Sequence, residues 1–116
     1  MQVTSVHVNL RVPDVAAART FYADYLGMSA EGIGMDWVTR LSDPTTGAGV
    51  QLLTRDATAP EDPVASLKVA DVEEAHDEAR RRGYEIVHPL TTEPWGVRRF
   101  FVRAPDGNVL NIAQQE

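Results

Sequence analysis

The chain has 116 residues, of which 43% are hydrophobic and 24% are charged, with a formal net charge of −6 and no cysteine. This length and composition predict one globular domain over residues 1–116, and the missing cysteines exclude a disulfide framework and any thiolate metal site. The negative charge argues against a nucleic-acid partner, and no segment has the pattern of a membrane span or a signal peptide, so we expect a cytoplasmic protein without a membrane partner.

The first half of the chain predicts a strand, a helix and three further strands. Residues 3–12 alternate between apolar and polar side chains, which indicates a half-buried strand. Asp14 is in place to cap the following helix, and Gly27 is in place to end it. The apolar residues expected to face inward from this helix are Val15, Ala18, Phe21, Tyr22, Tyr25 and Leu26. The three strands are predicted at residues 28–33, 35–41 and 48–54.

The second half repeats this order after a segment that has no periodicity. Residues 56–63 combine prolines with acidic residues, which indicates a linker. A strand at residues 64–69 precedes a helix that starts at Asp71 and stops before Gly83. A strand at residues 84–88, a loop at residues 89–96 and a closing hairpin follow, and Pro105-Asp106-Gly107 predicts the hairpin turn.

The two halves align at their helix starts, where Val12-Pro13-Asp14-Val15 corresponds to Val69-Ala70-Asp71-Val72. This correspondence indicates a duplicated βαβββ module, with module 1 at about residues 3–55 and module 2 at about residues 64–114. Two such modules side by side predict an α+β fold, in which an incompletely closed, eight-stranded, barrel-like sheet has its helices outside and a cavity on its concave face.

Several motifs make the sequence resemble one superfamily over nearly its whole length. They are the opening Ser5-Val6-His7-Val8-Asn9, the helix end Leu26-Gly27-Met28, the loop Pro94-Trp95-Gly96 and the turn Pro105-Asp106-Gly107-Asn108. With these motifs the chain resembles the vicinal oxygen chelate superfamily, also called the glyoxalase/bleomycin-resistance/dioxygenase superfamily. The resemblance implies the fold just described and a homodimer, with modules paired within one chain or between two. It leaves the activity open, because this fold carries isomerases, dioxygenases, thiol transferases and drug-binding proteins.

Enzymes of the superfamily hold a divalent metal with four side chains from four strands, and the resemblance assigns those positions to His7, Leu52, Val64 and Asn111. Leu52 and Val64 have no donor atom, and a neutral amide is a poor ligand, whereas a catalytic metal needs about three protein ligands. We therefore expect no metal site and no cofactor. A shift of register by one residue would bring Gln51 to the second position, but strand parity would then turn its side chain to the other face.

The remaining candidate residues share the parity or the location expected of a cavity lining. The pattern leaves three roles open for His7: a hydrogen-bonded structural histidine that faces a cavity, a residue that contacts ligand or transfers a proton, or a metal ligand. Lys68 is a solvated lysine or, as the rarer alternative, a Schiff-base nucleophile. Trp37 and Trp95 either contact ligand, as loop aromatics do in the antibiotic-binding relatives, or cover the core or a dimer interface. The complete candidate ligand-binding set is His7, Asn9, Trp37, Leu52, Ser66, Lys68, Trp95, Arg99, Phe101 and Asn111.

Three functions follow from these residues. The leading hypothesis is a metal-free protein that binds an aromatic or planar small molecule, cationic ones included, like the bleomycin-resistance branch. The alternative is an isomerase, lyase, cyclase or dioxygenase-like enzyme that uses His7 as its catalytic base or has an atypical metal site. A third reading is a structural or regulatory subunit with a vestigial cavity. The sequence does not separate an antibiotic-resistance role from a biosynthetic one.

Overall fold

The computed structural model describes residues 2–31 and 35–115 of the chain. They fall into two compact units: the first unit is His7–Thr58, and the second unit is Met1–Val6 together with Ala59–Glu116. The first residues of strand β1 (Val3–Arg11) belong to the second unit, and its last residues belong to the first unit. We describe each unit by itself.

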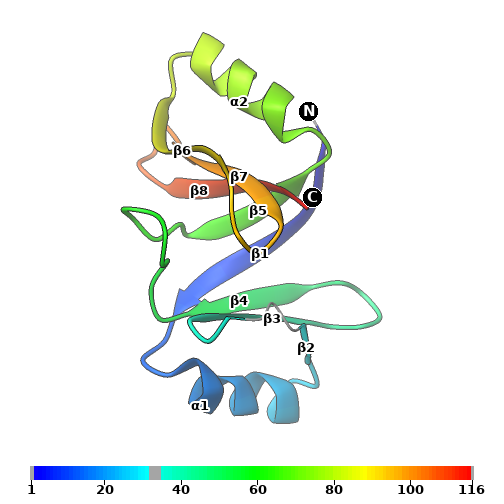
Figure 1. Ribbon diagram of the computed structural model, residues 1–116. Helices are drawn as coiled ribbons and strands as arrows, with labels where there is room; N and C mark the ends of the chain where they lie inside the picture. The colour runs from blue at the N-terminus through cyan, green and yellow to red at the C-terminus, as the bar shows by residue number, and fades with distance from the viewer. Residues whose placement is uncertain (1, 32–34, 116) are drawn as a thin grey trace. The chain divides into compact units, whose positions relative to one another are not determined.

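The first unit has a mixed sheet covered by a short helix (Figure 1). In this sheet β1 runs parallel to β4 (Gly49–Leu53), β4 pairs antiparallel with β3 (Val38–Ser42), and β3 pairs with β2 (Ser29–Glu31). Helix α1 (Val15–Thr20) contacts β3 and β4. The predicted cap is confirmed, because Asp14 accepts a hydrogen bond of 3.1 Å from the backbone N–H of Ala17.

The helical segment of the first unit continues as a π-helix, η1 (Phe21–Tyr25), and ends at Gly27 with a φ of +71°. The sequence predicted that its apolar residues face inward, and this is wrong for Phe21, Tyr25 and Leu26, which are 55%, 74% and 47% exposed. The wider π turn is the physical reason, because it changes the angle between successive residues and rotates the apolar positions away from the sheet.

The second unit repeats the arrangement with longer elements. Strand β5 (Ala65–Val69) runs parallel to β8 (Val109–Gln115), which pairs antiparallel with β7 (Val97–Arg103), and β7 pairs with β6 (Glu85–Thr92). Helix α2 (Val72–Arg81) contacts β6, β7 and β8 (Figure 1). Its predicted cap is confirmed, since Asp71 accepts from the N–H of Glu74 at 3.1 Å.

The core of the second unit lies between α2 and one side of this sheet. Val72, Ala75 and Ala79 from the helix pack with Phe100 and Ile112 from the strands. Val102 joins the same cluster. The alternation predicted for the final hairpin is therefore confirmed: Phe100 and Val102 face α2, and Arg99 and Phe101 face away from it.

Strand β6 is longer than the sequence predicted, because residues 89–92 continue the strand instead of starting a loop. Its register with β7 shifts twice, between Ile86 and His88 and again between His88 and Thr91. Pro89 lies in this interval, and a proline, which has no N–H to give to a ladder, is tolerated in a strand at such an irregularity. A pattern that contains proline reads as a loop, which explains the error.

The α+β class and the repeated βαβββ order are confirmed. No helix or strand lies between β4 and β5, where a linker was predicted. Residues 32 and 33 of the predicted strand at 28–33 lie outside the described residues. Within the described ranges, no helix is long and apolar enough to cross a membrane.

Candidate functional site

The second unit has a side of its sheet that faces away from α2, and we call it the polar face. Pairing across the strands places Ser66 beside Asn111, Asn111 beside Phe101, and Phe101 beside His88. All four are at most 7% exposed. Asn111 Nδ2 donates a hydrogen bond of 3.0 Å to Ser66 Oγ. Three predicted site residues, Ser66, Asn111 and Phe101, therefore lie together.

Asn111 has one hydrogen-bonding atom that this arrangement leaves unused. Its Oδ1 is buried and has no hydrogen-bond partner among the described residues. A buried carbonyl oxygen without a donor destabilises a fold by about 1–3 kcal/mol, so an unused acceptor is a feature to be explained. A ligand that carries an N–H or O–H group supplies such a donor.

The same face carries a buried ion pair. Arg99 donates from Nε and Nη2 to Glu93 Oε2, both at 2.7 Å, and the two side chains are about equally buried, at 5% and 4% exposed. The Arg99 guanidinium also lies 4.7 Å from the ring centre of Phe101 and 5.1 Å from that of Trp95. The pair is electrically neutral, and the two rings hold the guanidinium by cation–π contacts.

His88 completes this group from β6. Its ring centre lies 5.1 Å from that of Phe101, and its Nε2 lies 3.5 Å from Glu93 Oε2. The distance is that of an ion pair when His88 is protonated, yet Nε2 makes no hydrogen bond with any residue in the described part of the chain. The irregular register of β6 explains the position of His88, because such irregularities re-aim a side chain.

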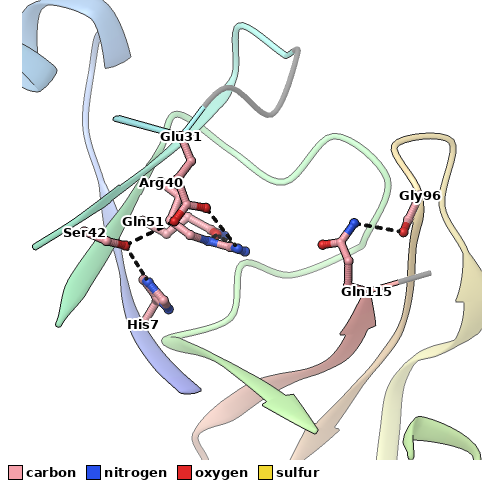
Figure 2. A network of polar contacts seen from close by, with 7 residues as sticks. All are labelled: His7, Glu31, Arg40, Ser42, Gln51, Gly96 and Gln115. Atoms are coloured by element: carbon pink, nitrogen blue, oxygen red, sulfur yellow. Dashed lines mark hydrogen bonds and ion pairs between the residues drawn. The ribbon is translucent and has the colours of Figure 1, made fainter. Parts of the chain in front are cut away.

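The first unit carries a separate chain of polar contacts around His7 (Figure 2). His7 Nε2 lies 3.2 Å from Ser42 Oγ, and Ser42 Oγ donates to Glu31 Oε1 at 3.5 Å. A hydroxyl has one proton, so the bond to Glu31 makes Ser42 the acceptor for an Nε2–H of His7. The contact holds the imidazole of His7 beside Ser42, as a side chain with a proton-transfer role requires.

Arg40 and Gln51 border this chain (Figure 2). Arg40 donates to Gln51 Oε1 from Nε at 3.4 Å and from Nη2 at 3.2 Å, and its Nη1 lies 3.7 Å from Glu31 Oε2. Figure 2 also draws a contact of the second unit, in which Gln115 Nε2 donates to the carbonyl oxygen of Gly96 at 3.3 Å.

The register of β4 corrects one predicted site residue. Asn9 pairs with Gln51, and Leu10 pairs with Leu52. Leu52 is therefore on the opposite side of the sheet from His7 and Asn9, and it is fully buried. Gln51, which the sequence assigned to the other face, shares the side of His7. The expected register was off by one residue, because a short apolar run gives no signal for which of its alternating sets faces the core.

The residues present do not fit the superfamily's metal site. In the first unit the corrected second position, Gln51, has its carbonyl oxygen bound to the Arg40 guanidinium, a cation that repels a second cation. In the second unit Val64 has no donor atom, and Asn111 offers only the oxygen of a neutral amide, which is a weak ligand. Among the described residues no group of three or more His, Cys, Asp or Glu side chains is placed to hold a metal ion.

The other predicted residues lie at the margins of these groups. Asn9 is in the row of Gln51 and Arg40, and Trp37 is half-buried just before β3. Lys68 is on the polar face, one row beyond Ser66, opposite Ala113. Trp95 lies against Arg99, so the loop that carries it reaches the polar face. A contact between Trp95 and a ligand, which is one of the two roles predicted for this residue, requires this position.

The sequence did not identify several residues that the site contains. Glu93 and His88 were missed because the ion pair depends on the irregular path of β6. Ser42, Glu31 and Arg40 were missed because they come from strands whose register was not predicted. Only Glu93 could have been found from the sequence. It is an acidic residue directly before Pro94-Trp95, and it precedes the arginines of the final hairpin, with which it could pair.

Comparison with solved structures finds similar folds among proteins of different description. A protein described as an NAD-dependent benzaldehyde dehydrogenase from Legionella pneumophila matches with a TM-score of 0.77 and 20% identity, over 97% of this chain and 100% of that chain. A glyoxalase/bleomycin resistance protein/dioxygenase superfamily member from Vibrio splendidus 12B01 matches with a TM-score of 0.70 and 19% identity, over 96% and 98%.

A Mn(II)-bound glyoxalase from Novosphingobium aromaticivorans matches with a TM-score of 0.71 and 14% identity, over 97% of this chain but 38% of that chain. These similarities show the fold alone. The comparison with curated proteins found no match. The family model for the Glyoxalase/Bleomycin resistance protein/Dioxygenase superfamily matches residues 4–112. The chain therefore belongs to this superfamily.

Proposed function

We propose that this protein binds an aromatic or otherwise planar small molecule, cationic ones included, without a metal ion, as bleomycin-resistance proteins do. The polar face of the second unit is the observation that carries the proposal. It combines the half-buried ring of Trp95, the Arg99–Glu93 pair against that ring and the unused acceptor of Asn111. Aromatic rings with a few placed polar groups are typical of small-molecule sites.

The charges of the polar face support a neutral or cationic ligand. Glu93 neutralises Arg99, so the pair offers no free positive charge to an anion. Asn111 Oδ1 accepts and cannot donate, which favours a ligand with an N–H group at its edge. The net charge of −6 adds weak long-range attraction for cations.

Binding of a planar cation tests the proposal directly. We expect the anisotropy of acriflavine to rise with protein concentration, and bleomycin to compete with it. Asn111→Leu keeps the side-chain volume and removes the acceptor, so the affinity for acriflavine is expected to fall about tenfold. Asn108→Leu, the same substitution at an exposed residue of the hairpin turn, serves as the matched control. The proposal is wrong if neither compound binds, or if Asn111→Leu binds both as the unchanged protein does.

A second candidate, an enzyme that uses His7 as a general base, is supported by the contacts of His7 with Ser42 and of Ser42 with Glu31. These contacts hold the imidazole in one position, as a general base needs. We expect any turnover of methylglyoxal with glutathione to be abolished by His7→Gln and retained by His76→Gln. Equal loss in both variants, or none in either, would remove His7 from the reaction.

A homodimer and a cytoplasmic location belong to the same proposal. The exposed aromatic side chains of Phe21 and Tyr25 support a dimer, because exposed apolar patches mark interaction surfaces. Light scattering coupled to size-exclusion chromatography tests this, and the mass of a single chain over the accessible concentration range would contradict it.

A further inference from the structure

The second unit contains a cavity on the opposite side of its sheet from the polar face. It has a volume of about 490 Å³ and lies between α2 and the strands, with Leu67, Phe100 and Leu110 on the strand side. Leu110 and Ile112 alternate with Asn111 along β8, so the cavity and the polar face are on different sides of the sheet. The two sites are therefore independent.

Small side chains on α2 explain the cavity. The helix turns Val72, Ala75 and Ala79 inward, and the two alanines, which line the cavity, end at their Cβ atoms. Interiors are normally packed without such space, and a volume of this size is within the range of about 300–1,000 Å³ that small-molecule pockets have. An apolar wall of this kind suits an apolar ligand body.

One carboxylate among the residues that line the cavity, that of Glu74, carries a negative charge that no neighbouring cation balances in the described part of the chain. Glu74, Glu78 and Arg82 line the cavity from one stripe of α2. Arg82, which lines the cavity too, balances the charge of Glu78 at 3.0 Å, and Arg81, which is not among the lining residues, approaches the other oxygen of Glu78 at 2.9 Å. In the described part of the chain the carboxylate of Glu74 has no hydrogen bond or ion pair, although its backbone N–H is held by Asp71. Glu74 is thus the charge available to a ligand.

We propose that this cavity binds an amphiphilic cation, with the apolar body between α2 and the sheet and an ammonium group at Glu74. Charge complementarity selects the cation, because an anionic head group would meet the uncompensated carboxylate. This site is separate from the one in the proposed function, and neither depends on the other.

Displacement of a neutral hydrophobic dye tests the proposal. We expect the fluorescence of N-phenyl-1-naphthylamine to rise when it binds. Decylamine, used below its micelle concentration, is expected to displace the dye at an about fivefold lower concentration than decanol does. This difference in concentration corresponds to the strength of a partly exposed ion pair. Decanoate is expected to be the weakest competitor. Glu74→Gln removes the preference for the amine and leaves displacement by decanol unchanged. Glu73→Gln, a change at the neighbouring residue, which pairs with Arg98, keeps the preference.

Filling the cavity separates this site from other dye sites. Ala79→Leu or, if that variant does not fold, Ala75→Val narrows the cavity and is expected to weaken dye binding, whereas Asn111→Leu on the polar face leaves it unchanged. The proposal is overturned if the dye does not bind, if the filled variants bind it unchanged, or if decylamine and decanol compete equally.

Discussion

His7 and Gly49 are in close contact between β1 and β4. A Cβ atom on Gly49 would lie 2.9 Å from Cδ2 and Nε2 of the His7 ring, and 2.5 Å from the carbonyl oxygen of Leu41. The absence of a side chain at position 49 is therefore what gives the imidazole its place beside Ser42.

Gly49→Ala is expected to destabilise the fold by roughly 1–3 kcal/mol, because the backbone oxygen of Leu41 cannot move away as a side chain can. Denaturant unfolding measures the change, and Ala48→Ser, at the exposed neighbouring residue, is the control. Adding His7→Ala to Gly49→Ala is expected to recover a part of the loss. A stability of Gly49→Ala equal to that of the unchanged protein would show that the sheet adapts freely here.

The buried pair of Glu93 and Arg99 gives a second prediction. Glu93→Gln leaves the Arg99 charge buried without its partner, which is expected to cost about 3–5 kcal/mol of the free energy of unfolding. Glu93→Gln combined with Arg99→Met removes both charges and is expected to regain most of the loss. The measurement is a double-mutant cycle by chemical denaturation.

The neighbouring residue supplies a matched control for that cycle. Arg98 pairs with Glu73 at 2.6 Å at the surface, with Glu73 60% exposed, so Arg98→Met is expected to cost at most about 1 kcal/mol. Equal losses for Glu93→Gln and Arg98→Met would mean that the inner pair is hydrated.

Asn111 and Ser66 give a prediction that separates stability from binding. Asn111→Leu combined with Ser66→Ala replaces two hydrogen-bonded groups and one unused acceptor by apolar groups, so the stability is expected to change by less than about 1 kcal/mol or to rise. The affinity for a planar ligand is expected to fall in the same variant. Thermal unfolding with and without acriflavine measures both effects, and a large loss of stability would show that the amide has a structural role.

The carboxylate of Glu78 predicts a dependence on pH. Hydrogen bonds from Arg82 and Arg81 hold its pKa below the ordinary value of about 4.5. A pKa that is lower in the folded than in the unfolded state contributes stability above the unfolded value, and this contribution is lost as the pH falls through the folded one. Glu78→Gln is expected to lose stability at neutral pH but to become less sensitive to acidification below about pH 4.5. Melting temperatures from pH 3 to 7 measure the difference, and parallel curves would contradict it.

The features that the sequence predicted correctly are set by neighbours in the chain. Asp14 and Asp71 cap their helices through backbone groups three residues away, and Gly27 ends its helix with a positive φ. The alternation of Phe100, Phe101 and Val102 likewise follows from one strand alone. These features are local, so a pattern in the sequence is enough to find them.

The features that the sequence missed depend on how distant strands pair. The faces predicted for Leu52 and Gln51 are the reverse of the observed ones, because the register of β4 is fixed by its pairing with β1 and β3 and not by its own sequence. Glu93 reaches Arg99, and His88 reaches Glu93, beside the irregular pairing of β6 with β7. The exposed Phe21 depends on a π turn that helical spacing does not predict.

This member of the superfamily has the superfamily's fold, and we propose that it binds its ligand without the superfamily's metal. Elemental analysis of protein purified without chelators or a metal-affinity tag, before and after incubation with nickel, zinc, iron and manganese, tests it most directly. We predict well below one metal ion per chain in every sample, because the side-chain oxygen of Gln51 is hydrogen-bonded to Arg40 and Val64 has no donor atom. A stoichiometry near one ion per chain that is lost in His7→Gln would contradict the account and make the metal-dependent enzyme the better description.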